Sequence, residues 1–522
     1  MKLDAVGLEV MAHAFAGVAE EMGAVLVASA VSPNIRERRD SSAALFDAGG
    51  EMVAQAAHIP VHLGAMPDAV AAVRALGPEP GDTYVLNDPF TGGTHLPDIT
   101  LVHAIELGRA VAGYTVVRAH HSDVGGARPG SMPPDSSEVF QEGLVIPPVR
   151  WAVRGLVVRD VERLLLANVR TPDMRRHDLA AQLAACERGA LRFQELVARH
   201  GAAHVAAAAG DLMDYAERRA RASVRERVRS GTYRATDWLE GDGLDDRDLA
   251  LKVAVTVLPD GRLTCDFSGT DGAARGNVNC PMSVTRSAAL FVLRCLVDDD
   301  IPTNGGLQRV LAVEAPAGCI VHAQHPRAVA SGNVETSQRI TDLLFAALAP
   351  AAAVPAQGQG TMNNVVFGGD GWTYYETMGG GQGASAVADG PSGVHVGMSN
   401  TRNTPVEVFE MELPIRIRTY ALRRGSGGVG RQRGGDGVVR EFEALAPMEV
   451  SLLGERRRHA PGGAAGGADG ACGANWLNGK PVPGRAALSL RAGDVLRIET
   501  PGGGGWGPPV NLPSVSRTPW PR

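Results

Sequence analysis

The chain has 522 residues, of which 44% are hydrophobic and 21% are charged. This length predicts three or four globular domains with enough apolar residues to build their cores. Its 51 basic and 57 acidic side chains leave a net charge of −6, and no basic block stands out, so we expect no nucleic-acid partner.

The segment 1–29 mixes acidic and apolar side chains, and no basic stretch precedes an uninterrupted apolar run. This pattern is unlike a signal peptide or a membrane-spanning helix, so we expect neither export by this route nor a membrane contact. The six cysteines include no closely spaced pair, which excludes a CxxC metal or redox motif. A reduced, cytoplasmic protein is therefore predicted.

Residues 1–177 are predicted to form an α/β region. Apolar residues at helical spacing predict a helix over 8–30, and two apolar runs around a glycine turn predict paired strands within 41–53. A second helix is expected over 64–76. Buried strands are expected over 84–86, 99–102 and 114–118.

Residues 178–230 are rich in alanine, arginine and glutamate at helical spacing, which predicts a helical connector. Residues 231–393 return to short alternating runs and predict a second mixed α/β region. Its expected elements are strands over 251–258, 263–267 and 310–313 and a helix over 284–296.

Residues 394–507 are predicted to be β-rich, and residues 508–522 to form a loose tail. Glycine is abundant at 65 of 522 residues, against a usual ~7%, and it clusters in the second half of the chain. Turns between short strands explain this clustering and favour a sandwich or barrel-like arrangement. The expected strands include 406–413, 438–442, 448–453 and 495–498.

The densest group of unusual polar residues lies in two loops, over 87–98 and 118–123, which adjoin predicted strand ends. Ligand sites of α/β sheets form at such ends. His95 and Asp98 are three positions apart in the first loop and His120 lies in the second, so two imidazoles and a carboxylate can reach one divalent ion. Zinc, manganese and iron suit that donor set. A single histidine would more often be a hydrogen-bonded loop residue, but several candidates in two loops favour a metal or acid/base site.

Six motifs in a fixed order resemble the hydantoinase B/oxoprolinase family over nearly the whole chain. They are IRERRDSSAALFD (35–47), HIPVHLG (58–64), NDPFTGGTHLPDITLV (87–102), SGNVETSQRITD (331–342), SNTRNTPVEVFE (399–410) and PGGGGWG (501–507). Members of that family are B-type subunits, or C-terminal halves, of ATP-dependent enzymes that hydrolyse cyclic amides such as hydantoins, oxoproline and lactams. Related subunits belong to acetone and acetophenone carboxylases.

The resemblance implies a set of metal ligands. Carried over to this chain, these are Asp40 of the RERxD motif together with His95, Asp98 and His120. Zinc is the first expectation, with manganese or iron as alternatives. The adjoining His121 and Asp123 are predicted to act as general base or as supporting partners of the ligands.

ATP is expected to bind elsewhere. The sequence contains no GxxxxGK[ST] motif, and the glycine run 379–383 is better interpreted as a tight turn than as a phosphate loop. The resemblance places ATP with its magnesium on a separate A-type ATP-binding subunit. We therefore expect a hetero-oligomer.

Three further features have competing interpretations. The polar stretch 333–339 is typical of a helix start capped by Thr336 or Ser337, and leaves Glu335 or Arg339 available for substrate or an interface. The run 456–459 (RRRH) is interpreted as a solvated face or subunit contact. Cys280 is interpreted as a buried thiol rather than a nucleophile.

The expected reaction follows from cyclic-amide chemistry. An unstrained lactam or hydantoin is a poor electrophile, so phosphorylation of its amide oxygen by ATP would activate it, and a metal would supply an activated water. An ATP-dependent ketone carboxylase subunit is the alternative with the same four metal ligands. A non-catalytic docking subunit is a third hypothesis. Carboxylases of the resembled type are longer and need further subunits, so the compact length of this chain favours hydrolysis.

Overall fold

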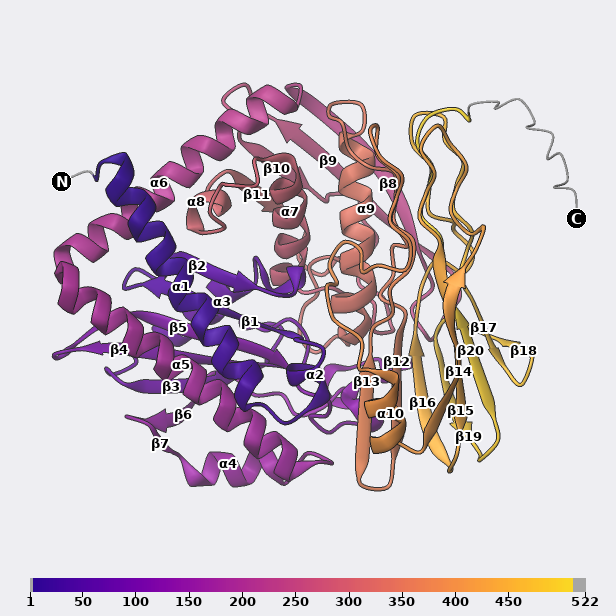
Figure 1. Ribbon diagram of the computed structural model, residues 1–522, viewed down its shortest axis with the longest axis horizontal. Coiled ribbons are helices and arrows are strands. Elements are labelled where there is room, and N and C mark those ends of the chain that lie inside the picture. The colour runs from indigo at the N-terminus through magenta and orange to yellow at the C-terminus, as the bar shows by residue number, and fades with distance from the viewer. Residues whose placement is uncertain (1–2, 510–522) are drawn as a thin grey trace, which may run out of the picture.

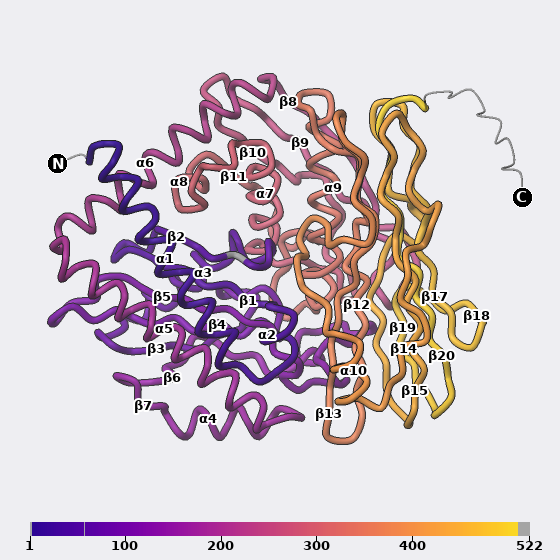
Figure 2. The backbone as a smooth tube through the Cα atoms, in the orientation of Figure 1, coloured from indigo at the N-terminus to yellow at the C-terminus, as the bar shows by residue number. Residues whose placement is uncertain are grey.

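Four β-sheets and ten α-helices are present within residues 3–509, which the computed structural model describes (Figure 1). The side chain of residue 57 is not among the described parts. The fold is mixed α/β with several sheets, as predicted. Figure 2 shows helix α1 (Ala5–Ser29) and the last strands of the chain at opposite ends of the molecule. Positions 510–522 of the predicted tail lie outside the described residues.

A seven-stranded sheet organises the segment 41–157, and every neighbouring pair within it is antiparallel. The strands expected around positions 41–53, 84–86, 99–102 and 114–118 all belong to it. Its spatial order is β2-β1-β5-β4-β3-β6-β7. The strands are β1 (Ser41–Asp47), β2 (Met52–Ala57), β3 (Asp82–Leu86), β4 (Asp98–Leu107), β5 (Ala110–His120), β6 (Val149–Val153) and β7 (Leu156–Val157).

Helices cover both faces of this sheet. Helix α1 and helix α5 (Pro172–His200) pack together on one face, whereas α3 (Met66–Arg74) contacts β4 and β5 on the other. Within residues 3–509, α1 alone is long and apolar enough to cross a membrane by length and composition. Its Phe15 and Met22 are fully buried against the sheet and α5, as in the core helix of a globular domain.

The predicted helical connector consists of α5 and α6 (Ala202–Arg227), which meet at Gly201. Gly201 has a φ of 85°, a backbone conformation that glycine adopts at little cost. Helix α5 packs on the first sheet, and α6 continues to the second core. The short helices α2 (Pro33–Arg36) and α4 (Arg159–Leu166) flank this region.

The second core is a four-stranded sheet covered by helices. Its order is β11-β10-β9-β8, and only the β10–β11 pair is parallel within the described chain. The expected strands and helix of this region are all found. The elements are β8 (Gly231–Glu240), β9 (Asp248–Val257), β10 (Leu263–Asp266), β11 (Leu311–Glu314), α7 (Met282–Leu296), α8 (Gly305–Gln308) and α9 (Ser337–Leu348).

Two further sheets face each other across a third core, in which Phe367 of one sheet meets Phe442 of the other at 5.0 Å between ring centroids. One sheet has the order β13-β12-β16-β19 and the other β14-β15-β20-β17-β18. The strands are β12 (Asn364–Gly369), β13 (Trp372–Glu376), β14 (Ile415–Arg423), β15 (Gly437–Ala444), β16 (Met448–Leu453), β17 (Ala474–Leu477), β18 (Lys480–Val482), β19 (Ala486–Leu490) and β20 (Val495–Glu499). Strands β12 and β13, which precede the predicted boundary at position 394, therefore pack together with strands that follow it.

The strand predicted over 406–413 is wrong, because these residues form helix α10 (Val406–Glu412). Its alternating apolar and acidic residues suggested a strand, but only Phe409 among them is buried. Pro405 precedes the helix, and glutamate and methionine are good helix formers.

The glycine-rich segments do more than form turns. Their backbones lie directly against one another, so that an added Cβ at Gly381 would come within 2.0 Å of the Gly435 carbonyl oxygen, and one at Gly503 within 2.1 Å of the Gln382 carbonyl oxygen. Backbone hydrogen bonds join the segments, including Gly503 N–H to Gly435 O at 2.9 Å. The run 379–383 is therefore part of a backbone stack, rather than an isolated tight turn or an open phosphate loop.

Candidate metal centre

Antiparallel pairing brings three separate chain segments together at one end of the first sheet. Asp98 begins β4 and His120 ends β5, and the two residues are direct cross-strand partners. Asp40 immediately precedes β1, and its carbonyl oxygen accepts a hydrogen bond from the His120 N–H at 3.0 Å. These residues converge because neighbouring strands run in opposite directions, so the start of β4 lies beside the end of β5.

The loop that carries His95 is held in place by Asn87 within it and by Arg118 of β5. The Asn87 side chain donates to the Leu96 carbonyl at 2.8 Å, and the buried Arg118 guanidinium donates to the Gly92 carbonyl at 2.7 Å. A Cβ at Gly93 would lie 2.2 Å from the Asn87 carbonyl oxygen, so the loop needs glycine there. The loop is therefore folded tightly on itself.

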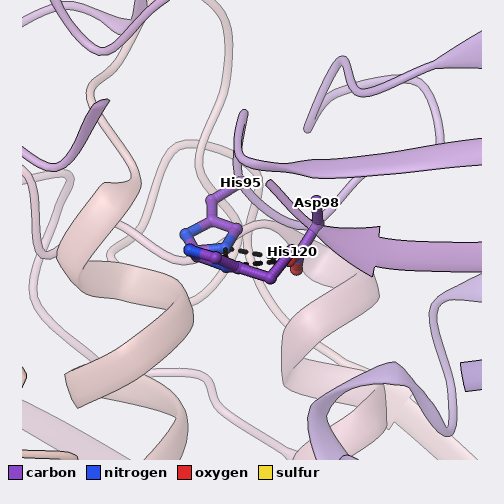
Figure 3. Close-up of side chains that lie close together, drawn as sticks. All are labelled: His95, Asp98 and His120. Carbon is purple, nitrogen blue, oxygen red and sulfur yellow. Dashed lines mark hydrogen bonds and ion pairs between the residues drawn. The ribbon is translucent and has the colours of Figure 1, made fainter. Parts of the chain in front are cut away.

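His95, Asp98 and His120 form a compact triangle of donor atoms (Figure 3). His95 Nε2, His120 Nδ1 and Asp98 Oδ1 lie 3.2 Å from one another along every side. A zinc tetrahedron with metal–ligand distances of about 2.05 Å has edges of about 3.3 Å. The three donor atoms thus have the spacing of one face of such a site, and the same donors suit manganese and iron.

Asp98 is held as an anion in the centre of this group. Its Oδ2 accepts a hydrogen bond from the Thr94 hydroxyl at 2.5 Å and lies 3.4 Å from His62 Nε2. Burial alone would raise the pKa of Asp98, but His95, His120 and His62 together hold it well below the ordinary value. A buried carboxylate with this environment is ready to bind a cation.

The protein keeps His120 largely neutral. Burial lowers the pKa of His120, and the ring of Tyr375 stacks on it at 4.3 Å between centroids. Arg38 fixes Tyr375 by donating to its carbonyl at 2.6 Å and by lying over its ring. His95 Nδ1 and His120 Nε2 are buried and have no hydrogen-bond partner within residues 3–509. These are the ring nitrogens that do not form the donor triangle. The neutral imidazole that burial favours at His120 is the form in which histidine binds a metal.

The residues present therefore fit a divalent metal. His95, Asp98 and His120 supply the convergent donors, and the buried Asp40 lines the same small cavity. This cavity measures only about 20 Å³.

The other two predicted site residues have different surroundings. His121 faces α5, where its Nε2 pairs with Gln182 Oε1 at 2.8 Å, and burial followed by the nearby Arg175 lowers its pKa to about 4. Asp123 accepts hydrogen bonds from the backbone N–H groups of Gly125, Gly130 and Arg170 and from the Arg170 side chain. The structure does not bring either side chain into the triangle of donors.

Sequence reasoning missed three residues around this centre. His62 contacts Asp98 and Ser42, Tyr375 covers His120, and Asn333 lines the cavity with a buried amide oxygen that has no partner within the described chain. His62 and Asn333 lie inside motifs that carry the family resemblance, which was a usable signal. Nothing near Tyr375 in the sequence pointed to it.

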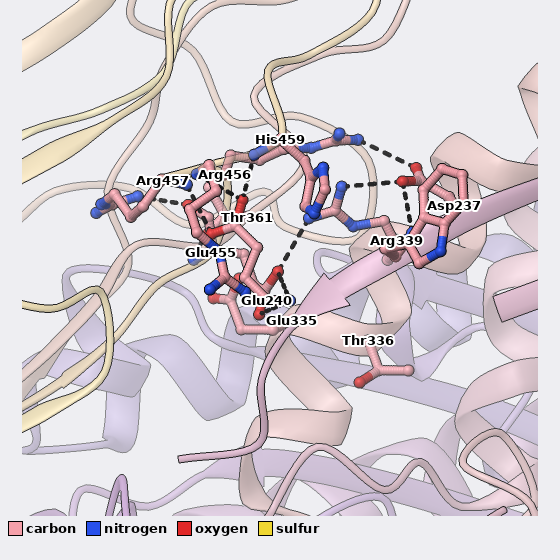
Figure 4. Close-up of polar contacts among 12 residues, drawn as sticks. Asp237, Glu240, Glu335, Thr336, Arg339, Thr361, Glu455, Arg456, Arg457 and His459 are labelled. Carbon is pink, nitrogen blue, oxygen red and sulfur yellow. Dashed lines mark hydrogen bonds and ion pairs between the residues drawn. The ribbon is translucent and has the colours of Figure 1, made fainter. Parts of the chain in front are cut away.

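A second cluster of buried polar side chains includes Arg339 and Arg456, for which the sequence left more than one role open (Figure 4). Arg339 is fully buried and contacts Asp237 at 3.4 Å and Glu455 at 3.0 Å, so its charge is already paired with carboxylates of the same chain. Arg456, from the predicted solvated run, is also buried and pairs with Asp342 at 2.5 Å. The solvated interpretation is therefore wrong for Arg456, because these carboxylates lie inside the protein.

The predicted helix caps before α9 are also wrong. Residues Gly332–Thr336 form a π-helix that runs directly into α9, so no free helix start exists there. Thr336 donates to the Val278 carbonyl and Ser337 to the Asn333 carbonyl. Cys280 is buried as expected, and burial raises the pKa of its thiol to about 12, which makes it a poor nucleophile.

The sequence profile described as hydantoinase B/oxoprolinase matches residues 4–509. The chain belongs to this family. An uncharacterized protein of Methanocaldococcus jannaschii is 39% identical over 97% of this chain and 91% of its own length. Arabidopsis thaliana 5-oxoprolinase 1 is also 39% identical over 97% of this chain, but the match covers 42% of that protein, so the chain spans less than half of its length.

Other similar proteins include the putative B-type component of a D-/L-hydantoinase from a Pseudomonas species, 31% identical over 98% of this chain and 91% of that protein. The crystal structure of an ATP-dependent caprolactamase from Pseudomonas jessenii has a TM-score of 0.91 and 28% identity, covering 98% of this chain and 92% of its own. Acetone carboxylase in its nucleotide-free form has a TM-score of 0.85 over 96% of this chain and 75% of its own, but its 18% identity shows a shared fold alone.

Proposed function

We propose that this chain is the metal-holding subunit of an ATP-dependent hydrolase that opens a cyclic amide such as a hydantoin, oxoproline or a lactam. The observation that carries the proposal is the buried triangle of His95, Asp98 and His120, with Asp40 as a fourth ligand candidate. A divalent metal there, with zinc as first choice and manganese or iron as alternatives, would supply Lewis acidity and lower the pKa of a water.

The chain's own residues prepare that site. Asp98 keeps its negative charge in a buried position, and ring nitrogens of His95 and His120 each lie 3.2 Å from its Oδ1. Tyr375 and the tight loop before Asp98 close the centre, so bulk water is excluded and electrostatic interactions inside it are strong. For His121 and Asp123 we propose the supporting part of their predicted role, in which they tie the loop after β5 to α5 and to Arg170.

ATP chemistry is assigned to an A-type ATP-binding partner subunit, and the assembly to a hetero-oligomer. The absence of a GxxxxGK[ST] motif in the sequence supports this assignment. The relative named as a B-type component of a hydantoinase, whose length this chain nearly matches, supports it as well. The caprolactamase, which is named as ATP-dependent, supports both the cyclic-amide substrate and the use of ATP. We place the enzyme in the cytoplasm, where ATP is available and cysteines stay reduced.

Turnover of cyclic amides by the co-expressed pair of subunits tests this proposal. The wild-type complex should open hydantoin, 5-oxoproline or ε-caprolactam only when ATP is present. His95→Ala and Asp98→Asn should each reduce that turnover by about 100-fold or more, because each removes one donor of the site.

The matched control is His103→Gln. His103 is also a buried histidine of β4, but it pairs with Thr83 at 2.9 Å and lies outside the donor triangle. Its variant should keep turnover, and thermal melts should show all variants folded. Turnover that persists in both site variants would refute the proposal. Consumption of a ketone with bicarbonate, and of no cyclic amide, would instead establish the carboxylase alternative.

A further inference from the structure

A second cavity of about 420 Å³ adjoins the metal centre. It lies between α7, α9 and the segment 395–400, and Pro60 forms part of its wall. Pro60 begins the short helix Pro60–His62, whose last residue contacts Asp98. Ser399 lines both this cavity and the small cavity of the metal centre. The short helix and Ser399 thus contribute to the walls of both spaces.

The two cavities differ greatly in size. The space at the metal centre, about 20 Å³, holds about one water molecule, so a five- to seven-membered ring does not fit there. The adjoining cavity falls within the range of about 300–1,000 Å³ that is usual for small-molecule sites.

The walls of the larger cavity suit the carbon skeleton of a small ring. Phe291 of α7 and Phe345 of α9 are half-buried and supply apolar ring faces. At the end nearest the metal centre, His395 pairs with the Ser399 hydroxyl at 3.1 Å, and burial lowers the pKa of His395 to about 4, so this end is polar but uncharged. The Asp342 carboxylate on the wall is already paired with Arg456.

We propose that this cavity is the substrate-binding site, in which the cyclic amide places its carbon skeleton against Phe291 and Phe345 and its amide edge toward Ser399. The inference rests on the proposed function, because it assigns the cavity to the substrate of the neighbouring metal centre. Phe291 and Phe345 then determine which ring sizes are accepted, and Ser399 forms the passage to the donor triangle.

Cys295 provides a direct test because it lines the cavity. Within the described chain it is the exposed cysteine, whereas Cys186, Cys265, Cys280 and Cys319 are buried and Cys472 is intermediate. The protein around it raises the pKa of the Cys295 thiol to about 11 by desolvation, so alkylation with N-ethylmaleimide requires mildly alkaline solution. The adduct would occupy the space that the ring needs.

The experiment compares the wild-type and Cys295→Ala complexes with the A-type partner, each before and after alkylation, with mass spectrometry to locate the adduct. Alkylation should lower kcat/KM of the wild type for cyclic amides by at least about tenfold and leave the Cys295→Ala complex unaffected. Hydantoin, 5-oxoproline or ε-caprolactam, whichever is turned over, should slow alkylation of Cys295 in the wild type.

Three other outcomes would overturn the inference. Unchanged turnover after full alkylation of Cys295 would show that the ring binds elsewhere, while the proposed function would stand. Release of the partner subunit on alkylation, seen by size-exclusion chromatography, would make the cavity a subunit contact instead. An untreated wild-type complex that opens no cyclic amide would refute the proposed function, and with it the occupant assigned here.

Discussion

Glu335 is a buried carboxyl group that stays protonated at neutral pH. Burial, with a further contribution from the neighbouring Glu455 carboxylate, raises its pKa to about 8, although the Thr361 hydroxyl and the Met362 N–H favour the ionised form. An unfolded glutamate has a pKa of about 4.3. Between about pH 4.3 and about pH 8, Glu335 therefore keeps a proton in the folded state that it has lost in the unfolded state.

This difference in the pKa of Glu335 between the folded and unfolded states decides how the free energy of unfolding changes with pH. The stability that Glu335 contributes is fully present below about pH 4.3 and is lost as pH rises through about 8. Glu335→Gln keeps an acceptor for Met362 but cannot ionise, so the free energy of unfolding of this variant should fall less steeply over that window. Denaturant unfolding of the wild type and of Glu335→Gln at several pH values measures this difference in slope. Parallel pH profiles would contradict the prediction, and Glu449→Gln, at a half-exposed position, is the control.

At the scale of residues, sequence reasoning selected side chains that the structure brings together where their spacing along the chain was informative. The spacing of His95, Asp98 and His120 suggested a shared metal, and the structure places their donor atoms 3.2 Å apart. Asp40 was selected only by family resemblance, because its approach depends on the pairing of β1 with β5. Tyr375 comes from β13, in another sheet and far along the chain from His120, and no local pattern marks so distant a contact.

At the scale of elements, the π-helix Gly332–Thr336 sets the position of Asn333 beside the metal centre. An added Cβ at Gly332 would lie 1.8 Å from the Asn279 carbonyl oxygen, so the π-helix has to shift if the residue is larger. Gly332→Ala should therefore lower the free energy of unfolding by about 1–3 kcal/mol and reduce turnover. Calorimetry and the turnover assay measure these effects.

Gly210 in α6 is the matched glycine for this substitution. Nothing lies within 4 Å of the Cβ that alanine would add there, and its backbone is helical. Gly210→Ala should therefore stabilise the protein by about 0.5–1 kcal/mol. Equal effects of the two substitutions would show that the close approach at Gly332 is not what restricts that position.

The elements themselves were predicted well where apolar spacing was regular. Helices α1 and α7 and strands β4 and β5 lie where the patterns placed them, because their buried faces repeat at helical or strand periods. Helix α10 was mistaken for a strand because it buries one residue only. The glycine stack was beyond prediction, since it depends on backbone contacts between segments that lie far apart in the sequence.

At the scale of the whole molecule, a buried ionic cluster joins the second core to the C-terminal sheets (Figure 4). Arg339 of α9 lies between Asp237 of β8 and Glu455, which follows β16. Arg339→Met would leave two buried carboxylates without this cation and should lower the free energy of unfolding by about 3–5 kcal/mol. Urea unfolding followed by circular dichroism measures the loss.

A surface arginine supplies the comparison. Arg418 is half-exposed and pairs with Glu443 at 3.1 Å, and such an exposed pair is worth about 1 kcal/mol or less. Arg418→Met should therefore have little effect. A loss at Arg339 no larger than that at Arg418 would show that the buried cluster does not join the two parts of the molecule energetically.

Metal content tests most directly whether His95, Asp98, His120 and Asp40 hold one metal, as proposed above. Plasma mass spectrometry on the purified wild type, His95→Ala and the His103→Gln control should find about one zinc, manganese or iron per chain in the wild type and the control. The metal should be lost from His95→Ala while its thermal melt shows a folded protein. Equal metal content in wild type and His95→Ala, or no bound metal in either, would contradict the account.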